Sequence, residues 1–391
     1  MKITAIETVL VNAIHRNWIF VKVVTDQPGL YGWGEATLEW KTRSVVGAIE
    51  DLAPFVVGQD PFRIEHIVGR MMGFSFWQLG AIGMSALSGL EQARWDIKGK
   101  ALGVPVWQLL GGAVRDHVRV YTHLRRAKIG AQIGTEDISA FCDAVEETVA
   151  MGYNAVKLGF VPYTGYDARP AEVRHVEKLA NAVRDRVGWD VDIMTDFHGR
   201  PDSLEAAKAF IDVIAPIRPL FIEEPIQPGN TPALADLARR VDCPLATGER
   251  LFTSREFAEV AETRAVSIIQ PDLAHCGGFS GGRKIAAIAE AAGIGVAPHN
   301  PMGPVAGAVA LQFDVATKNF VIQEEAVGLV PWFEEVCSSH PLQLTNGVWE
   351  VPQAPGIGIE INEEAAKRYP FKQEEIPALE AVLPDGRIAN W

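Results

Sequence analysis

Acidic and imidazole side chains recur along the second half of the chain at nearly constant intervals. The intervals are 27, 26, 23, 27 and 25 residues, and they separate Asp196, Glu223, Glu249, Asp272, His299 and Glu324. Carboxylate oxygens are the ligands that Mg²⁺ prefers, and a histidine carries a proton near neutral pH. If the fold gathers these residues, they could bind a cation and move a proton beside it.

Short apolar segments precede these residues and predict the elements that would gather them. From about His117 such segments alternate with amphipathic helices, which is the pattern of a parallel sheet. The candidate strands are VRVYTHL, AVKLGF, VDIMTDFH, LFIEEP, PLATGER, VSIIQPD, IGVAPHN and FVIQEE. Nearly all end on a polar residue, as in barrel enzymes, whereas a doubly wound sheet concentrates its chemistry at one switch point. We therefore expect an α/β barrel of eight units.

The two ends of the chain differ from these units. The first segment reads as strands, ITAIETVLV and IFVKVVTD, and helical periodicity follows from about Ser44. The last segment, from Asn346 onward, is rich in turns and short strand-like runs. We expect residues 1–115 to form an α+β capping domain that residues 350–391 join, and residues 116–349 to form the catalytic barrel.

Composition narrows the possible partners. The chain has 391 residues and a net charge of −13, which opposes binding to nucleic acid or anionic lipid. It has neither an apolar run long enough for a membrane span nor a signal-like start, so we expect a cytoplasmic protein. Its four cysteines lack CxxC spacing and predict neither a zinc site nor a disulfide framework.

Three carboxylates on successive strand ends, Asp196, Glu223 and Glu249, are the candidate metal ligands. A single acidic residue at a strand end could equally be a helix cap or half of a surface salt bridge. Three of them in register favour a shared Mg²⁺ with open positions for a substrate carboxylate.

Two histidines are candidates for proton transfer. His299 stands one unit after Asp272, which could accept the second ring N–H and so fix the tautomer of the base. His198 follows Asp196 by two residues, so its side chain would reach the same face from another side. The alternative for either one alone is a hydrogen-bonded structural histidine.

Ordered motifs along the whole chain resemble the enolase superfamily, in its mandelate racemase subgroup. The motifs include GWGE at 32–35, WDIKGK at 95–100, DFHGR, FIEEP, GER, QPDLAHCGG, APHNPMGP, QEE and PGIGIEI at 355–361. The resemblance implies a (β/α)7β-type TIM barrel whose α+β cap is built from both ends of the chain. It also implies one Mg²⁺ per subunit and a homo-oligomer.

The resemblance also implies roles at matching positions. Asp196, Glu223 and Glu249 match the metal ligands, and His299 with Asp272 matches the catalytic His-Asp dyad. His198 matches the general acid of the sugar-acid dehydratases in this subgroup. Glu324 matches an acid that hydrogen-bonds the substrate carboxylate, for which it must be protonated or use a bridging partner.

One position departs from the subgroup's pattern. Racemases place Lys-x-Lys at the end of the second barrel strand, whereas here Lys157 is followed by Gly159. Lys157 is therefore expected to be an electrostatic partner of the substrate carboxylate or of the metal ligands, with a structural lysine as the alternative. Trp18 and Arg200 are further candidates for substrate contact, with core packing and a structural salt bridge, respectively, as the alternatives.

These residues favour a Mg²⁺-dependent dehydratase. It would act on a galactonate-like sugar acid and form a 2-keto-3-deoxy acid through an enediolate. One alternative is a racemase or epimerase of a 2-hydroxy acid that uses His198 and His299 on opposite faces. The other is a binding protein without catalysis on the same fold, which the intact set of ligands and dyad disfavours.

Overall fold

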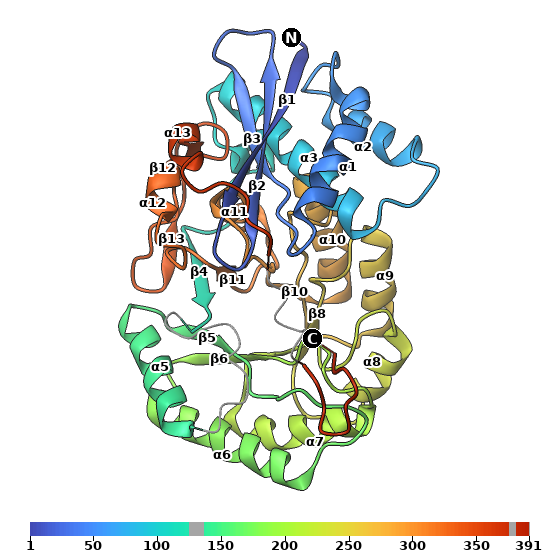
Figure 1. Ribbon diagram of the computed structural model, residues 1–391, viewed down its shortest axis with the longest axis vertical. Coiled ribbons are helices and arrows are strands. Elements are labelled where there is room, and N and C mark those ends of the chain that lie inside the picture. Colours follow the sequence, from blue (N-terminus) through green and yellow to red (C-terminus); the bar gives the residue numbers. More distant parts are fainter. Residues whose placement is uncertain (125–136, 375–380, 391) are drawn as a thin grey trace.

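The structure is a computed structural model that describes residues 1–124, 137–374 and 381–390. A barrel occupies the lower part of Figure 1, and a cap of strands and helices lies above it. Within the described residues, no helix has both the length and the apolarity needed to cross a membrane.

Eight parallel strands build the barrel, and each coincides with one of the eight strand segments expected from the sequence. They are β4 (His117–Thr122), β5 (Ala155–Leu158), β6 (Asp192–Asp196), β7 (Ile222–Glu223), β8 (Leu245–Thr247), β9 (Ile268–Ile269), β10 (Gly295–Val296) and β11 (Gln323–Glu325). They pair in the order β10-β9-β8-β7-β6-β5-β4-β11. A parallel bridge between Val296 and Phe320 joins the two ends of this order and closes the barrel.

Where the structure describes the connections between these strands, it contains seven helices. They are α5 (Ile138–Ala150), α6 (Pro170–Val187), α7 (Leu204–Ile214, followed by a 3₁₀ turn, Ala215–Ile217), α8 (Thr231–Ala238), α9 (Ser254–Thr263), α10 (Gly278–Ala292) and α11 (Pro304–Ala316). One helix between each pair of successive strands is the expected (β/α)7β arrangement, which is thereby confirmed.

Each strand, or the residue directly next to it, contributes one side chain to a layer inside the barrel. The layer contains Tyr121, Ala155, Met194, Phe221, Ala246, Ile268, Ala297 and Ile322, all buried. Large and small side chains are mixed around the ring, so the interior is filled with side chains as in other small barrels. The layer fixes which strand positions point inward.

The cap begins with an antiparallel sheet of three strands, β1 (Ile3–Asn12), β2 (Asn17–Thr25) and β3 (Tyr31–Glu35). Four helices follow: α1 (Thr42–Val56), α2 (Ile64–Gly73), α3 (Gly80–Leu102) and α4 (Val106–Leu109). The apolar faces of the sheet and of α1 to α3 form a separate core around Val21, Leu87 and Leu90. The cap thus has its own core and meets the barrel along α3 and β3.

The C-terminal segment returns to the cap, as expected. Its elements are α12 (Phe333–Val336), β12 (Cys337–Ser339), β13 (Val348–Glu350), β14 (Glu360–Ile361) and α13 (Glu363–Ala366). β13 pairs antiparallel with β4 at the barrel's N-terminal end. Further along, Glu360 accepts hydrogen bonds from Tyr31 and Trp33, and the Asn17 side chain makes two hydrogen bonds to the main chain of Lys372.

Two glycines of β3 allow this sheet to lie directly on α3. A methyl group at Gly34 would stand 2.0 Å from the carbonyl oxygen of Gly89, and one at Gly32 would stand 2.0 Å from that of Ala93. Backbone atoms cannot swing aside as a flexible side chain can. Only glycine therefore permits this approach.

We predict that Gly34→Ala lowers the free energy of unfolding by roughly 1–3 kcal/mol, because overpacking forces the sheet and helix apart. Gly47→Ala in α1 is the matched control, since nothing lies within 4 Å of its added methyl group. It should raise the free energy of unfolding by about 0.5–1 kcal/mol, because alanine favours a helix interior. Urea denaturation measures both, and equal stability of the two variants would contradict the prediction.

Candidate active site

Alternation along the strands places the polar residues at the barrel mouth. Side chains two residues apart on a strand point to the same face. Six polar residues each follow a residue of the interior layer by two positions in the sequence. They are His123, Lys157, Asp196, Glu223, His299 and Glu324. Glu249 reaches the same place by a turn at Gly248, whose φ is +148° and which lies against the main chain of Gln270.

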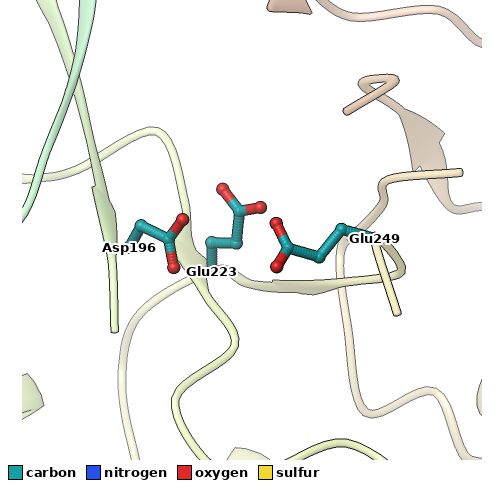
Figure 2. Close-up of side chains that lie close together, drawn as sticks. All are labelled: Asp196, Glu223 and Glu249. Atoms are coloured by element: carbon teal, nitrogen blue, oxygen red, sulfur yellow. The ribbon is translucent and has the colours of Figure 1, made fainter. Parts of the chain in front are cut away.

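The three expected metal ligands meet at one point. Asp196, Glu223 and Glu249 each offer a carboxylate oxygen, and these oxygens lie within 4.8 Å of one another. Figure 2 shows the carboxylates of Glu223 and Glu249 turned toward each other, with that of Asp196 beside them. Asp196 and Glu223 are buried, and Glu249 is half-buried. The sequence prediction that these side chains converge is thereby matched by the geometry.

His198 lies beside Asp196, at one end of the acidic triad. Its Nε2 is 3.1 Å from Asp196 Oδ2, and its backbone N–H donates to Asp196 Oδ1 at 2.8 Å. The backbone of His198 is left-handed, with φ of +51°, a conformation that histidine adopts more readily than most residues. This turn directs the imidazole back toward the triad instead of continuing along the strand.

Arg200 determines which ring nitrogen of the neutral His198 carries the hydrogen. Its Nη2 lies 3.2 Å from His198 Nδ1, and its Nη1 donates to the carbonyl oxygen of Val161 at 2.7 Å. A guanidinium only donates, so Nδ1 must accept. The proton of the neutral imidazole therefore sits on Nε2, the nitrogen that faces the triad.

His299 lies at the other end of the triad and pairs with Asp272. His299 Nδ1 is 2.8 Å from Asp272 Oδ2, and His299 Nε2 is 3.1 Å from Glu249 Oε2. Burial lowers the pKa of His299, but Glu324 and Asp272 raise it more, to about 9. His275, behind Asp272, is buried, and its Nε2 lies 3.6 Å from the same carboxylate.

Lys157 and Glu324 link the triad to the first barrel strand. Lys157 Nζ lies 2.7 Å from Glu223 Oε2, 2.9 Å from Glu324 Oε1 and 3.4 Å from Asp196 Oδ2. Lys157 is thus a partner of the candidate metal ligands, one of the two roles expected for it. Burial opposes ionisation of Glu324, but Lys157 and His299 overcome it and hold its pKa well below the ordinary value.

The lowered pKa of Glu324 favours one of the two alternatives expected for it. A deprotonated Glu324 cannot donate a hydrogen bond to a substrate carboxylate, so the bridging-partner alternative is the one that fits. His123 Nε2 hydrogen-bonds Glu324 Oε1, and the backbone N–H of Asn300 donates to Oε2 at 2.9 Å. The sequence analysis did not single out His123, although it follows VRVYT at a strand end like the other site residues.

Family models match both parts of the chain. Residues 3–111 match the N-terminal domain of the mandelate racemase and muconate lactonizing enzymes, and residues 140–365 match an enolase C-terminal domain-like model. The chain belongs to the mandelate racemase branch of the enolase superfamily. Enolase-superfamily enzymes use Mg²⁺ with a lysine or histidine base, and this superfamily member presents residues of both kinds at its barrel mouth.

Full-length relatives of this superfamily member carry dehydratase names. It is 36% identical to the D-galactonate dehydratase of Pectobacterium atrosepticum and 38% identical to that of Xanthomonas campestris, with complete coverage of both chains in each comparison. A provisionally named galactarate dehydratase from Agrobacterium radiobacter, solved with Na and L-malate, superposes with a TM-score of 0.89. The two are 33% identical over all of both chains.

The triad has the properties of a cation site. Within the described residues, Glu223 Oε1 is buried and has no hydrogen-bond partner, so a cation would satisfy an otherwise costly carboxylate oxygen. Burial and the Asp196 charge raise the pKa of Glu223 well above its ordinary value. Burial and the Glu224 charge do the same for Glu249. Hard oxygen ligands of this kind fit Mg²⁺.

Two of the expected substrate contacts lie away from the open mouth. Trp18 is 2% exposed and packs on Phe20 and edge-on against Phe333, which is the core-packing alternative. Arg200 is fully buried on Val161 and His198, so it acts on the histidine rather than reaching a substrate directly. For both residues the structure favours the structural alternative that the sequence left open.

We predict that Mg²⁺ affinity falls as the pH is lowered through the raised pKa values of its carboxylate ligands, by about tenfold per pH unit for each proton that binding displaces. The reason is that the pKa values of Glu223 and Glu249 are raised, and both must be ionised to act as ligands. Calorimetry in buffers of different ionisation enthalpy measures the released protons. Glu223→Gln should abolish binding and Asp96→Asn, a buried carboxylate in the cap, should not; pH-independent uptake would contradict the prediction.

Proposed function

We propose that the protein is a sugar-acid dehydratase that removes water from a galactonate-like aldonic acid and yields a 2-keto-3-deoxy acid. The observation that carries the proposal is an acidic triad with a histidine at each end, His198 at Asp196 and His299 at Glu249. The full-length likeness to D-galactonate dehydratases supports the same reaction class.

The triad is proposed to hold one Mg²⁺ per subunit. When bound, the ion would withdraw electron density from the substrate carboxylate and so acidify the adjacent C–H bond. Glu249 would then share its charge between this site and His299 Nε2, which lies 3.1 Å away. Glu249 would then attract a proton on His299 Nε2 less strongly. This would favour the neutral imidazole, which is the form that can act as a base.

His299 is proposed as the base that removes the proton next to the carboxylate. Asp272 accepts from Nδ1 at 2.8 Å, which orients the ring and leaves Nε2 facing the triad. The imidazolium formed by proton transfer is stabilised by Asp272 and Glu324, the same groups that raise the pKa of His299. The dyad thus both aims the base and favours its protonated product.

His198 is proposed as the acid that protonates the departing hydroxyl group. Its Nε2 lies on the side of the triad. The acid is the imidazolium form, in which a proton on Nδ1 takes the place of the Arg200 hydrogen bond, and delivery of the Nε2 proton leaves a neutral ring. Acid and base therefore stand at opposite ends of one acidic centre. This arrangement allows one group to take a proton from carbon while the other delivers a proton to oxygen.

Lys157, Glu324 and His123 are proposed to surround the substrate carboxylate. Lys157 is a buried cation. Burial lowers its pKa, but the charges of Glu223 and Glu324 outweigh burial and raise the pKa well above the ordinary value. Glu324 orients Lys157 and His123 rather than donating itself. A substrate carboxylate at this place would lie next to the positive charge of Lys157. Lys157 would then act as an electrostatic partner and not as a base.

The remaining assignments follow the same resemblance. Residues 1–115 with 350–391 are proposed as the cap, and residues 116–349 as the catalytic barrel. The enzyme is proposed to be a cytoplasmic homo-oligomer. Galactonate is the first substrate to test, and galactarate is the second because of the Agrobacterium neighbour's name.

We predict that the protein, with Mg²⁺ and an aldonate in D₂O, forms a 2-keto acid detectable as its absorbing derivative. His299→Asn should lose both this product and deuterium exchange at carbon 2. His198→Asn should lower product formation by about 10²–10⁴ and retain the exchange, because only the base contacts that proton.

His117→Asn is the matched control, since His117 is an exposed residue at the opposite end of β4 from the site. It should behave like the unmodified protein. Recovery of deuterated epimer without keto acid would instead establish a racemase. Absence of both product and exchange across a panel of aldonates and aldarates would remove the proposal.

A further inference from the structure

One polar side of cap helix α3 holds the loop that follows β9. Ser85 Oγ lies 2.8 Å from His275 Nδ1, and Ser88 Oγ accepts from the backbone N–H of Gly277 at 2.9 Å. Gln92 Nε2 donates to the carbonyl oxygen of Leu273 at 2.8 Å. These α3 side chains are fully buried. The loop they hold begins immediately after Asp272.

Glu91 on the same helix binds the start of α10. Its two carboxylate oxygens accept from the backbone N–H groups of Phe279 and Ser280, each at 2.9 Å. No side chain of the preceding segment caps α10. The cap therefore supplies, from about 190 residues away in sequence, the acceptor that a helix N-terminus needs.

Glu35, at the end of β3, binds the start of α11 in the same way. It accepts from the backbone N–H of Gly303 at 2.7 Å and from that of Ala306 at 2.8 Å. Its own backbone N–H donates to Gln92 Oε1 at 2.8 Å, which joins the two sets of contacts. No side chain of its own loop caps α11 either. The loop before α11 carries His299.

Glycines make room for both carboxylates. A methyl group at Gly278 would stand 1.9 Å from Glu91 Oε2, and one at Gly303 would stand 2.4 Å from Glu35 Oε1. The contacts are therefore close-fitting on both sides. Small movements of either carboxylate would be passed directly to the loop that it holds.

We propose that Glu35 and Glu91 are positioning residues for the Asp272–His299 dyad, each fixing from the cap one of the two loops that carry it. The proposal rests on the proposed function for its effect on turnover, but its geometric content does not. Asp272 and His299 come from different strands, so their 2.8 Å contact depends on the relative placement of two loops. Misplacement of a reacting group by about 1 Å can cost about 10²-fold in rate.

Asp96 offers a matched control on the same helix. It is a fully buried carboxylate that accepts from the backbone N–H groups of Trp33 and Ile357, both at 2.9 Å. Its partners belong to the cap and the C-terminal segment, not to the loops of the dyad. Asp96→Asn therefore reports the cost of disturbing a buried carboxylate of the cap without a direct effect on the dyad.

The test compares Glu35→Gln, Glu91→Gln and Asp96→Asn in the full-length protein with Mg²⁺. We expect the two glutamate variants to lose about 10- to 10²-fold in kcat with little change in KM, because Lys157, Glu324 and His123, the groups proposed to surround the substrate carboxylate, come from other strands than the dyad. Asp96→Asn should lower the melting temperature and keep the kcat of the unmodified protein. Equal losses of kcat in all three variants, or a change in KM alone, would overturn the proposal.

A second readout does not depend on activity. The hydrogen-bonded Nδ1–H of His299 should give a low-field proton NMR signal, assigned by its loss in His299→Asn. We expect this signal to shift or broaden in Glu35→Gln and Glu91→Gln and to be unchanged in Asp96→Asn. An unchanged signal in both glutamate variants refutes the proposal, even if the protein dehydrates no sugar acid. If Glu35→Gln does not fold, the Glu91 variant decides.

Discussion

Three carboxylates held within 4.8 Å of one another at a buried barrel mouth are the constraint on which the rest of the site depends. Like charges at this distance raise one another's pKa, as they do for Glu223, and burial adds to the cost. Lys157 offsets part of the charge through contacts with Asp196 and Glu223. A divalent cation would offset the remainder, so the arrangement has the properties of a metal centre rather than of a structural salt bridge.

The neighbouring groups are arranged around this acidic centre from two sides. The barrel arranges the site residues around its mouth, because each of the successive parallel strands places one side chain there. The cap fixes the loops that carry the dyad, through Glu35 at α11 and the polar side of α3 at α10. The placement of His299, the proposed base, beside Asp272 therefore depends on both parts of the chain.

Much of this arrangement could be predicted from the sequence, because it depends on local periodicity. The near-constant interval between Asp196, Glu223 and Glu249 reflects one strand and one helix per unit, and alternation along a strand fixes which side points inward. The strands of the cap sheet could also be predicted from their strand-like runs, whereas the return of the C-terminal segment to the cap was implied by the family resemblance. The same rules, applied to the first strand, would have found His123.

What could not be predicted depends on contacts between residues far apart in the chain. Glu35 and Gly303 are 268 positions apart, and no periodicity connects them. The choice between the two roles left open for Trp18 and Arg200 has the same basis, since their burial depends on Phe333 and Val161 on other segments. The ionised state of Glu324 likewise follows from Lys157 and His299, whose distances only a folded chain defines.

The central claim is that Asp196, Glu223 and Glu249 bind one divalent cation together. Anomalous diffraction from crystals grown with Mn²⁺ in place of Mg²⁺ tests it most directly. The account predicts one strong peak per chain, with an oxygen of each of the three carboxylates at roughly 2 Å. A peak bound by other residues, or well-ordered crystals in which the three side chains diverge and hold no metal, would contradict it.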